Sequence, residues 1–211
     1  MDNITNVTVK PLDRGGKFVT PIRVDYEQDG KAKFWEAVRV SKSVSCVIFN
    51  VSRRKFVCVR QFRPAVYVNG ADGIVWSEPD VANIGPEISA KSGVTWEFCG
   101  GICDKPGLSL EQICVEEVLE ETGYAVKAES LVKIGTSRCH VGVAGEAQTV
   151  YYVEVTDDMR RGPGGGIDEE MIDVVELGVD EAKSMLGDDT VVAPTDFFWG
   201  LSWFFLNKNQ A

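Results

Sequence analysis

One stretch of the chain, GGICDKPGLSLEQICVEEVLEETGY at residues 100–124, indicates both the fold and the site. Ser109, followed three residues later by Gln112, forms a capping-box pattern that predicts a helix beginning at residue 110. Gly123 provides the left-handed residue that ends it. At about 100° of rotation per residue, three carboxylates continue the apolar stripe of this helix. The stripe comprises Leu110, Ile113, Cys114, Glu117, Glu120 and Glu121.

Carboxylates on the inward face of the last helical turns are electrostatically unfavourable. The helix dipole favours cations at this end, and Glu117 repels its neighbours at i+3 and i+4. A bound divalent cation would offset both effects, and hard oxygen ligands on one face suit Mg²⁺, with Mn²⁺ as an alternative. The other interpretation is a solvated, glutamate-rich helix end.

The segment Glu117-Val118-Leu119-Glu120-Glu121-Thr122-Gly123 resembles the second half of the sequence box of the Nudix hydrolases. The resemblance implies that Glu117, Glu120 and Glu121 bind metal and that Glu121 belongs to the catalytic group. Gly101 matches the box glycine. The preceding Gly100 offers the backbone carbonyl that often completes the metal shell.

The chain departs from this box at two positions. Glu116 stands where the family has an arginine, and Leu108 stands where it has its first glutamate. In the family these two residues mainly brace the loop on the helix. Two residues that act as a structural pair are expected to be lost together. The prediction therefore keeps the three glutamates as metal ligands.

Longer strings on both sides of the box narrow the resemblance within the family. They are SVSCVIFNVSRRKFVCVRQFRPAVY, DKPGLSLEQ, VTDDMRRGPGGG and GLSWFF, and they are similar to the animal members that hydrolyse UDP-sugars. This similarity implies Mg²⁺-dependent hydrolysis of UDP-glucose to UMP and glucose 1-phosphate. Two alternatives stay open: an ADP-ribose or ADP-sugar pyrophosphatase, and a non-catalytic nucleotide-sugar-binding module.

A general base is expected in a late acidic loop, as in relatives of the ADP-ribose pyrophosphatase type. That loop reads RRGPGGGIDEE, residues 160–170, and alignment of the following EMIDVV places Glu170 first and Asp168 second as the base. The glycines suit a mobile lid that carries a carboxylate, and the alternative is a disordered solvent loop. Glu146, just before a predicted strand, matches a further acidic site position in those relatives.

Three more side chains are candidates for substrate binding. Arg60 and Arg63, in VRQFRP, could hold a diphosphate because arginine binds phosphate through two parallel hydrogen bonds. For Arg63, structural pairing with the acidic helix is the alternative. Trp35 could stack on uracil, although a strand tryptophan is more often core.

Strands dominate the predicted elements and helices flank them, which indicates an α+β class with a mixed sheet. We expect strands at 43–50, 55–62, 94–99, 130–135, 147–155 and 171–177, helices at 110–122, 180–186 and 196–206, and a hairpin at 17–26 and 33–40. The resemblance implies a Nudix α/β/α sandwich over residues 41–211. A small antiparallel N-terminal β-ribbon at 1–40 would precede it and serve dimerisation, because related enzymes are homodimers that exchange N-terminal strands.

Composition limits the remaining possibilities. The chain has 211 residues, with 22 Lys and Arg against 32 Asp and Glu, and its net charge of −10 argues against nucleic-acid binding. We expect no membrane segment and no signal peptide, hence a cytoplasmic location with six reduced cysteines. A single histidine excludes a multi-histidine metal site.

Overall fold

The centre of the protein is a seven-stranded mixed sheet. The computed structural model describes residues 4, 7–9, 12, 15–70, 82–83 and 88–208. The main strand order is β11-β5-β4-β10-β9, with β7 pairing to β5 and β8 pairing to β4. Its strands are β4 (Ser43–Asn50), β5 (Lys55–Phe62), β7 (Val94–Glu97), β8 (Cys99–Ile102), β9 (Val132–Arg138), β10 (Ala147–Val155) and β11 (Ile172–Gly178). The sheet is mixed because β10 runs parallel to β4 while the other pairs are antiparallel.

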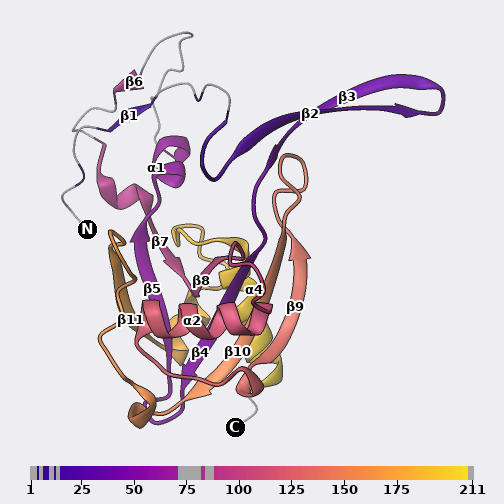
Figure 1. The fold of residues 1–211 in the computed structure, drawn as a ribbon. Helices are drawn as coiled ribbons and strands as arrows, with labels where there is room; N and C mark the ends of the chain where they lie inside the picture. The colour runs from indigo at the N-terminus through magenta and orange to yellow at the C-terminus, as the bar shows by residue number, and fades with distance from the viewer. Residues whose placement is uncertain are drawn as a thin grey trace.

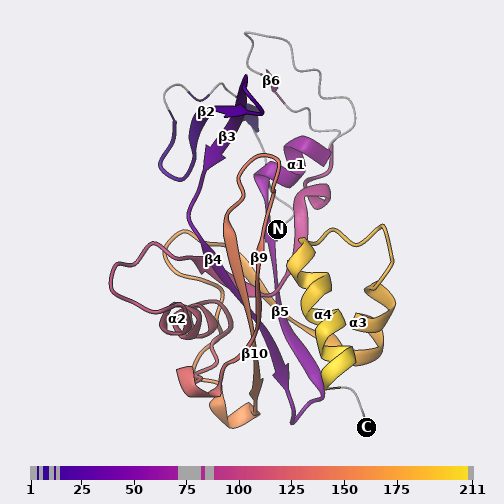
Figure 2. The same ribbon diagram turned by 90° about the vertical axis from the view of Figure 1, so that its right-hand side faces the viewer.

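Helices cover both faces of this sheet (Figure 2). Helix α2 (Leu110–Thr122) lies on one face, and α3 (Val179–Met185) and α4 (Thr195–Asn207) lie on the other. Helix α1 (Pro64–Gly70) follows β5, and three short 3-10 helices lie at Ala90–Gly93, Ala128–Ser130 and Asp157–Met159. The predicted α+β class and α/β/α sandwich are confirmed. None of the helices in the described ranges has the length and apolarity needed to cross a bilayer.

Two hydrophobic clusters hold the three layers together, one on each face of the sheet. Alternation along β4 sends Val44, Cys46 and Ile48 toward α2, and Val47 and Phe49 toward α4. The apolar residues of α4 belong to the second cluster, so this helix packs in the hydrophobic core of its own chain. All six cysteines are free thiols, as expected.

The sequence prediction of a single strand at 94–99 is wrong in one respect. The chain breaks at Phe98, so that β7 pairs with β5 while β8 pairs with β4. The two halves serve different neighbours because the partner strands β4 and β5 diverge at this end of the sheet (Figure 1). This break places the glycine pair 100–101 beside β4.

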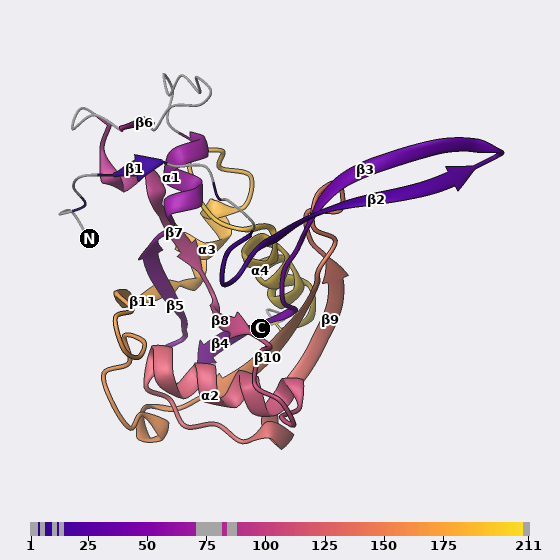
Figure 3. The same cartoon turned by 45° about the horizontal axis from the view of Figure 1, so that its top comes forward.

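A long β-hairpin, β2 (Thr20–Gln28) and β3 (Lys31–Arg39), projects from the body (Figures 1 and 3). Asp29 and Gly30 have positive φ angles of 53° and 72°, as its tight turn requires. Its base is held by a hydrogen bond from the Val38 amide to the Val143 carbonyl at 2.8 Å. The expected hairpin is thus present, and a further two-stranded pair joins β1 (Thr8–Val9) to β6 (Ala82–Asn83).

Candidate active site

Helix α2 begins and ends where its sequence predicts. The Ser109 hydroxyl accepts a hydrogen bond from the Gln112 amide at 3.2 Å, and the Gln112 side chain accepts one from the Ser109 amide at 2.8 Å. Gly123 ends the helix in the left-handed conformation, with φ 77°. Because both caps depend on neighbouring residues, they fix the bounds of the helix locally, and packing of Ile113, Cys114 and Val118 on the sheet fixes which face is turned inward.

The three glutamates of the stripe are buried to different degrees. Glu121 is 4 % exposed, whereas Glu117 and Glu120 are partly buried. The Gly100 amide donates a hydrogen bond to Glu121 Oε2 at 3.1 Å. A Cβ atom on Gly101 would lie 2.3 Å from Glu117 Oε1, so the Glu117 carboxylate packs directly against the Gly101 backbone. Strand β8 and the last turns of α2 therefore lie side by side. We call Gly100, Gly101, Glu117, Glu120 and Glu121 together the acidic recess.

The electrostatics of this recess disfavour ionised carboxylates. Burial, followed by the charge of Glu120, raises the pKa of Glu117 to about 7. Burial also raises the pKa of Glu121 to about 8, with the charges of Glu117 and Glu170 adding to it against the hydrogen bond from Gly100. The repulsion expected between residues three and four apart on α2 is thus present.

The donor set fits a hard divalent cation. Among the described residues, no three His, Cys, Asp or Glu side chains stand close enough together to form a ready-made metal site. The recess nevertheless offers carboxylate oxygens at i, i+3 and i+4 of one helix, two of them with unfavourable negative charge. Because Gly101 has no side chain, the Glu117 carboxylate can lie against its backbone. A cation would both attract these carboxylates and offset their desolvation.

Stability of the metal-free protein is expected to fall as pH rises from about 5 to 9. Glu117 and Glu121 have raised pKa values in the fold, so the folded state holds more protons than the unfolded chain across this window. The free energy of unfolding then decreases with pH, by a few kcal/mol at most because Glu117 is partly solvated. We expect the melting temperature in EDTA to fall by about 5 °C, measured by calorimetry.

Added Mg²⁺ tests the same linkage from the other side. Since it binds the ionised carboxylates, it should raise the melting temperature more at pH 9 than at pH 6. Glu121→Gln should flatten the decline seen in EDTA. An equal Mg²⁺ effect at both pH values would contradict the assignment.

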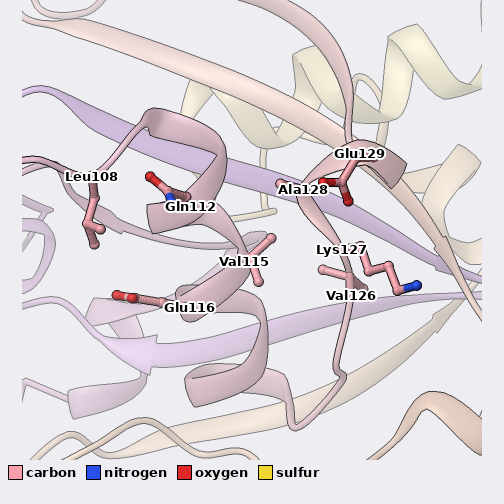
Figure 4. A pocket seen from close by; sticks show the side chains of 8 residues that line it. All are labelled: Leu108, Gln112, Val115, Glu116, Val126, Lys127, Ala128 and Glu129. Carbon is pink, nitrogen blue, oxygen red and sulfur yellow. The ribbon is translucent and has the colours of Figure 1, made fainter.

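The two departures from the box lie on the outer side of α2, around a shallow pocket (Figure 4). Leu108 and Glu116 line it together with Gln112 and Val115 from the helix region. None of the predicted site residues lines it. Lys105 Nζ donates to Glu116 Oε2 at 2.6 Å and lies 3.9 Å from Glu120 Oε1. An ion pair thus links the loop to the helix, with the lysine on the loop and the glutamate on the helix.

Exchanging these two charges should test the brace. Lys105→Glu alone would oppose Glu116 and lower the free energy of unfolding by up to about 1 kcal/mol, because the pair is solvent-exposed. Glu116→Lys alone should lower the free energy of unfolding by a similar amount, and the double exchange should recover most of the loss. Urea denaturation of all four proteins measures the coupling, and additive losses in the double exchange would rule out the brace.

Arg63 is held by a carboxylate that sequence analysis missed. Its Nε and Nη2 atoms donate to the two oxygens of Glu97 at 2.8 and 2.6 Å. These hydrogen bonds raise the pKa of Arg63, and the charges of Glu121 and Glu170 add to the effect. The alternative of pairing with the acidic helix is therefore wrong, since the partner lies on β7. A charged residue within the apolar TWEFCG string was the available signal for Glu97; nothing comparable marked Lys105.

Arg60 and Arg63 lie on different faces of the sheet. Alternation along β5 puts Arg60 on the α4 side, where its guanidinium lies 5.1 Å from the centroid of the Trp96 ring. Among the described side chains, Arg60 Nε is one of two buried polar atoms without a hydrogen-bond partner; the other is Glu146 Oε2. Glu146 Oε1 lies 2.8 Å from Nδ1 of His140 in the β9–β10 loop.

Trp35 is half exposed and lies outside the core, in the middle of the projecting strand β3. Its indole N–H donates to the Gly142 carbonyl at 2.8 Å. The core alternative for Trp35 is therefore wrong. This contact and the contact of Glu146 with His140 both involve the β9–β10 loop, so the structure brings these two predicted residues to the same loop.

The acidic loop is docked on the end of α2 in this structure. The amides of Gly165 and Gly166 donate to the Glu121 and Glu120 carbonyls at 2.8 and 3.1 Å. Glu170 is exposed, yet its charge acts on Glu117, Glu121 and Arg63. Asp168 is exposed as well, with a positive φ of 53°. Glycines in this segment thus permit close backbone contact with α2, and motion of the loop as a lid stays a prediction.

The chain matches no family model, but it is similar to known proteins over most of its length. The chain is 37 % identical over 196 residues to the uridine diphosphate glucose pyrophosphatase NUDT14 of Bos taurus, covering 89 % of this chain and 88 % of that one. It is 35 % identical to the Mus musculus enzyme of the same name, covering 97 % and 96 %. A GDP-mannose pyrophosphatase of Enterobacter sp. (strain 638) is 30 % identical over 187 residues, covering 87 % and 78 %.

Proposed function

Since the chain belongs to the Nudix hydrolase family, we propose that it hydrolyses the diphosphate of UDP-sugars, with UDP-glucose giving UMP and glucose 1-phosphate. The observation that carries this proposal is the similarity to two uridine diphosphate glucose pyrophosphatases over nearly the whole chain. The acidic recess on α2 supports it. Its carboxylates can meet a polyanionic substrate only with a cation between them.

Each part of the site has a proposed role. Glu117, Glu120, Glu121 and the Gly100 carbonyl would hold Mg²⁺. When bound, the metal neutralises phosphate oxygens and promotes attack by water on phosphorus. Glu170 is the proposed general base, with Asp168 as the second candidate. Arg63 is oriented by Glu97, and the charge of Glu121 acts on it. This arginine would hold the diphosphate.

The remaining substrate contacts stay predictions with different degrees of structural support. Arg60 and Glu146 each carry a buried polar atom without a partner among the described residues. Arg60 lies on the α4 side of the sheet, on the opposite face from the glutamates of α2, so its role in binding the diphosphate has no support from its position. Trp35 keeps an exposed ring that could stack on uracil, while its N–H is already engaged.

Substrate profiling in ¹⁸O-labelled water with Mg²⁺ tests the function. We expect UDP-glucose to be cleaved with a higher kcat/KM than ADP-ribose or GDP-mannose, with one ¹⁸O atom incorporated into a single product. The position of the label shows which phosphorus is attacked. Preferential cleavage of ADP-ribose would identify an ADP-sugar pyrophosphatase instead. GDP-mannose is included because bacterial relatives are named for it. Binding without turnover would indicate a non-catalytic module.

We propose that the enzyme works as a homodimer in the cytoplasm. The projecting hairpin exposes several apolar side chains, and an isolated two-stranded ribbon is marginally stable by itself. These side chains are Ile22, Val24, Tyr26, Phe34 and Trp35. Six free thiols suit a reducing compartment. Light scattering at micromolar concentration should give twice the chain mass, and a monomer there would contradict the dimer.

A further inference from the structure

The carboxyl end of α2 is completed by a segment about forty residues further along the chain. The last carbonyls of a helix have no partner within it. Here the Gly166 amide donates to the Glu120 carbonyl at 3.1 Å, and the Gly165 amide to the Glu121 carbonyl at 2.8 Å. The Arg161 amide donates to the Gly123 carbonyl at 2.7 Å. Residues 161–166, the docked segment, thus replace solvent at the end of the helix that carries the three glutamates.

Glycine is required at particular positions of this contact. Gly164 has φ +73°, and a Cβ atom there would lie 2.3 Å from the Glu121 carbonyl oxygen. The obstacle is backbone in the last turn of a helix, so it cannot turn aside as a side chain would. Gly162 differs, because a Cβ atom on it would meet nothing within 4 Å. The docked segment therefore contains both a glycine that the contact needs and one that it does not.

The docked segment leads directly to the acid at the loop tip. Gly166 has φ +85°, and a Cβ atom on it would lie 2.5 Å from Glu170 Oε2. The Ile167 amide donates to Glu170 Oε2 at 3.0 Å, and the Glu170 amide donates to the Ile167 carbonyl at 3.0 Å. Two hydrogen bonds thus close the short turn between the docked Gly166 and Glu170. The position of Glu170 relative to α2 is set by backbone contacts.

We propose that docking of residues 161–166 on the end of α2 is a positioning device that holds Glu170 beside the glutamates of the same helix, with Gly164 as its positioning residue. The proposal rests on the proposed function, in which Glu170 is the general base. One helix would then carry the metal ligands on its side chains and locate the base through its terminal carbonyls. A misplaced base loses rate steeply, since about 1 Å of displacement can cost about 10²-fold.

A double-mutant cycle on the full-length enzyme tests this device, with UDP-glucose and Mg²⁺. Gly164→Ala should lower kcat by about 10²-fold with little change in KM, and Gly162→Ala, the matched control, should stay within about twofold of the parent. Glu170→Gln should lower kcat by about 10²-fold or more. Gly164→Ala added to Glu170→Gln should then cost less than about threefold, because the positioned group is already gone. A purely structural defect would multiply with the loss at Glu170.

The possible outcomes distinguish a failure of the positioning device from a failure of the proposed function. Multiplicative losses in the double variant, or equal losses in the Gly162 and Gly164 variants, overturn the positioning role while the hydrolase remains. An inactive parent enzyme refutes the proposed function, and an unaffected Glu170→Gln refutes the base and the device with it. If circular dichroism shows that Gly164→Ala does not fold, Gly165→Ala decides by the same cycle. Gly165 has φ +108°, and its added methyl group meets no atom closer than 3.5 Å, so the change strains the docked backbone without touching the Glu170 side chain.

Discussion

Replacing Glu121 with glutamine is expected to abolish most hydrolysis while leaving the fold intact. Glu121 is the most buried of the three glutamates and the one bonded to the Gly100 amide. Glutamine keeps the size and the acceptor oxygen but removes the charge that would bind a cation. We expect kcat to fall by about 10²–10³-fold, the loss typical when one preorganised electrostatic group is removed from an active site. Steady-state hydrolysis of UDP-glucose at saturating Mg²⁺ measures it.

Stability gives this experiment its control. Because burial raises the pKa of Glu121 to about 8, its ionised form is unfavourable in the metal-free fold at high pH. Glu121→Gln should therefore melt at the same temperature as the parent or above it in EDTA at pH 9. Glu116→Gln, on the outer side of the same helix, should retain activity within about threefold. An active Glu121→Gln enzyme, or an inactive Glu116→Gln enzyme, would remove the recess from the mechanism.

Replacing Glu170 with glutamine should lower kcat by about 10²–10⁴-fold, the contribution of a positioned general base. The adjacent acids provide matched comparisons, because Asp168 and Glu169 lie in the same exposed turn. Glu169→Gln should remain near the parent rate. Asp168→Asn should have a smaller effect than Glu170→Gln, since the charge of Glu170 is the one that acts on Glu117, Glu121 and Arg63.

The pH dependence of kcat shows whether this loss belongs to a base. In the parent enzyme, the rate at low pH should fall as the base becomes protonated, and Glu170→Gln should remove that limb of the profile. The experiment is performed at saturating Mg²⁺ so that protonation of the metal-binding glutamates does not dominate. If Asp168→Asn removes the limb and Glu170→Gln does not, the base is Asp168.

Local patterns in the sequence were sufficient to predict helix α2 and the face that carries its three glutamates. Its capping box, its left-handed glycine and the spacing of Glu117, Glu120 and Glu121 depend only on residues close together along the chain. Helix geometry then converts that spacing into one face. The hairpin at the N-terminus and the alternating strands were equally predictable, because a period of two needs no knowledge of the partner strand.

Contacts between distant segments were decided only by the tertiary structure. Lys105 and Arg63 each had several acidic residues available, and the folded arrangement of loop, helix and strands brings Lys105 to Glu116 and Arg63 to Glu97. The glycines of the loop indicated flexibility in the sequence, and the structure uses Gly164, Gly165 and Gly166 for close contact with α2. A glycine allows both outcomes, because its lack of a side chain permits motion in solvent and close approach against another backbone. Which one occurs depends on what lies opposite, and a local pattern does not contain that information.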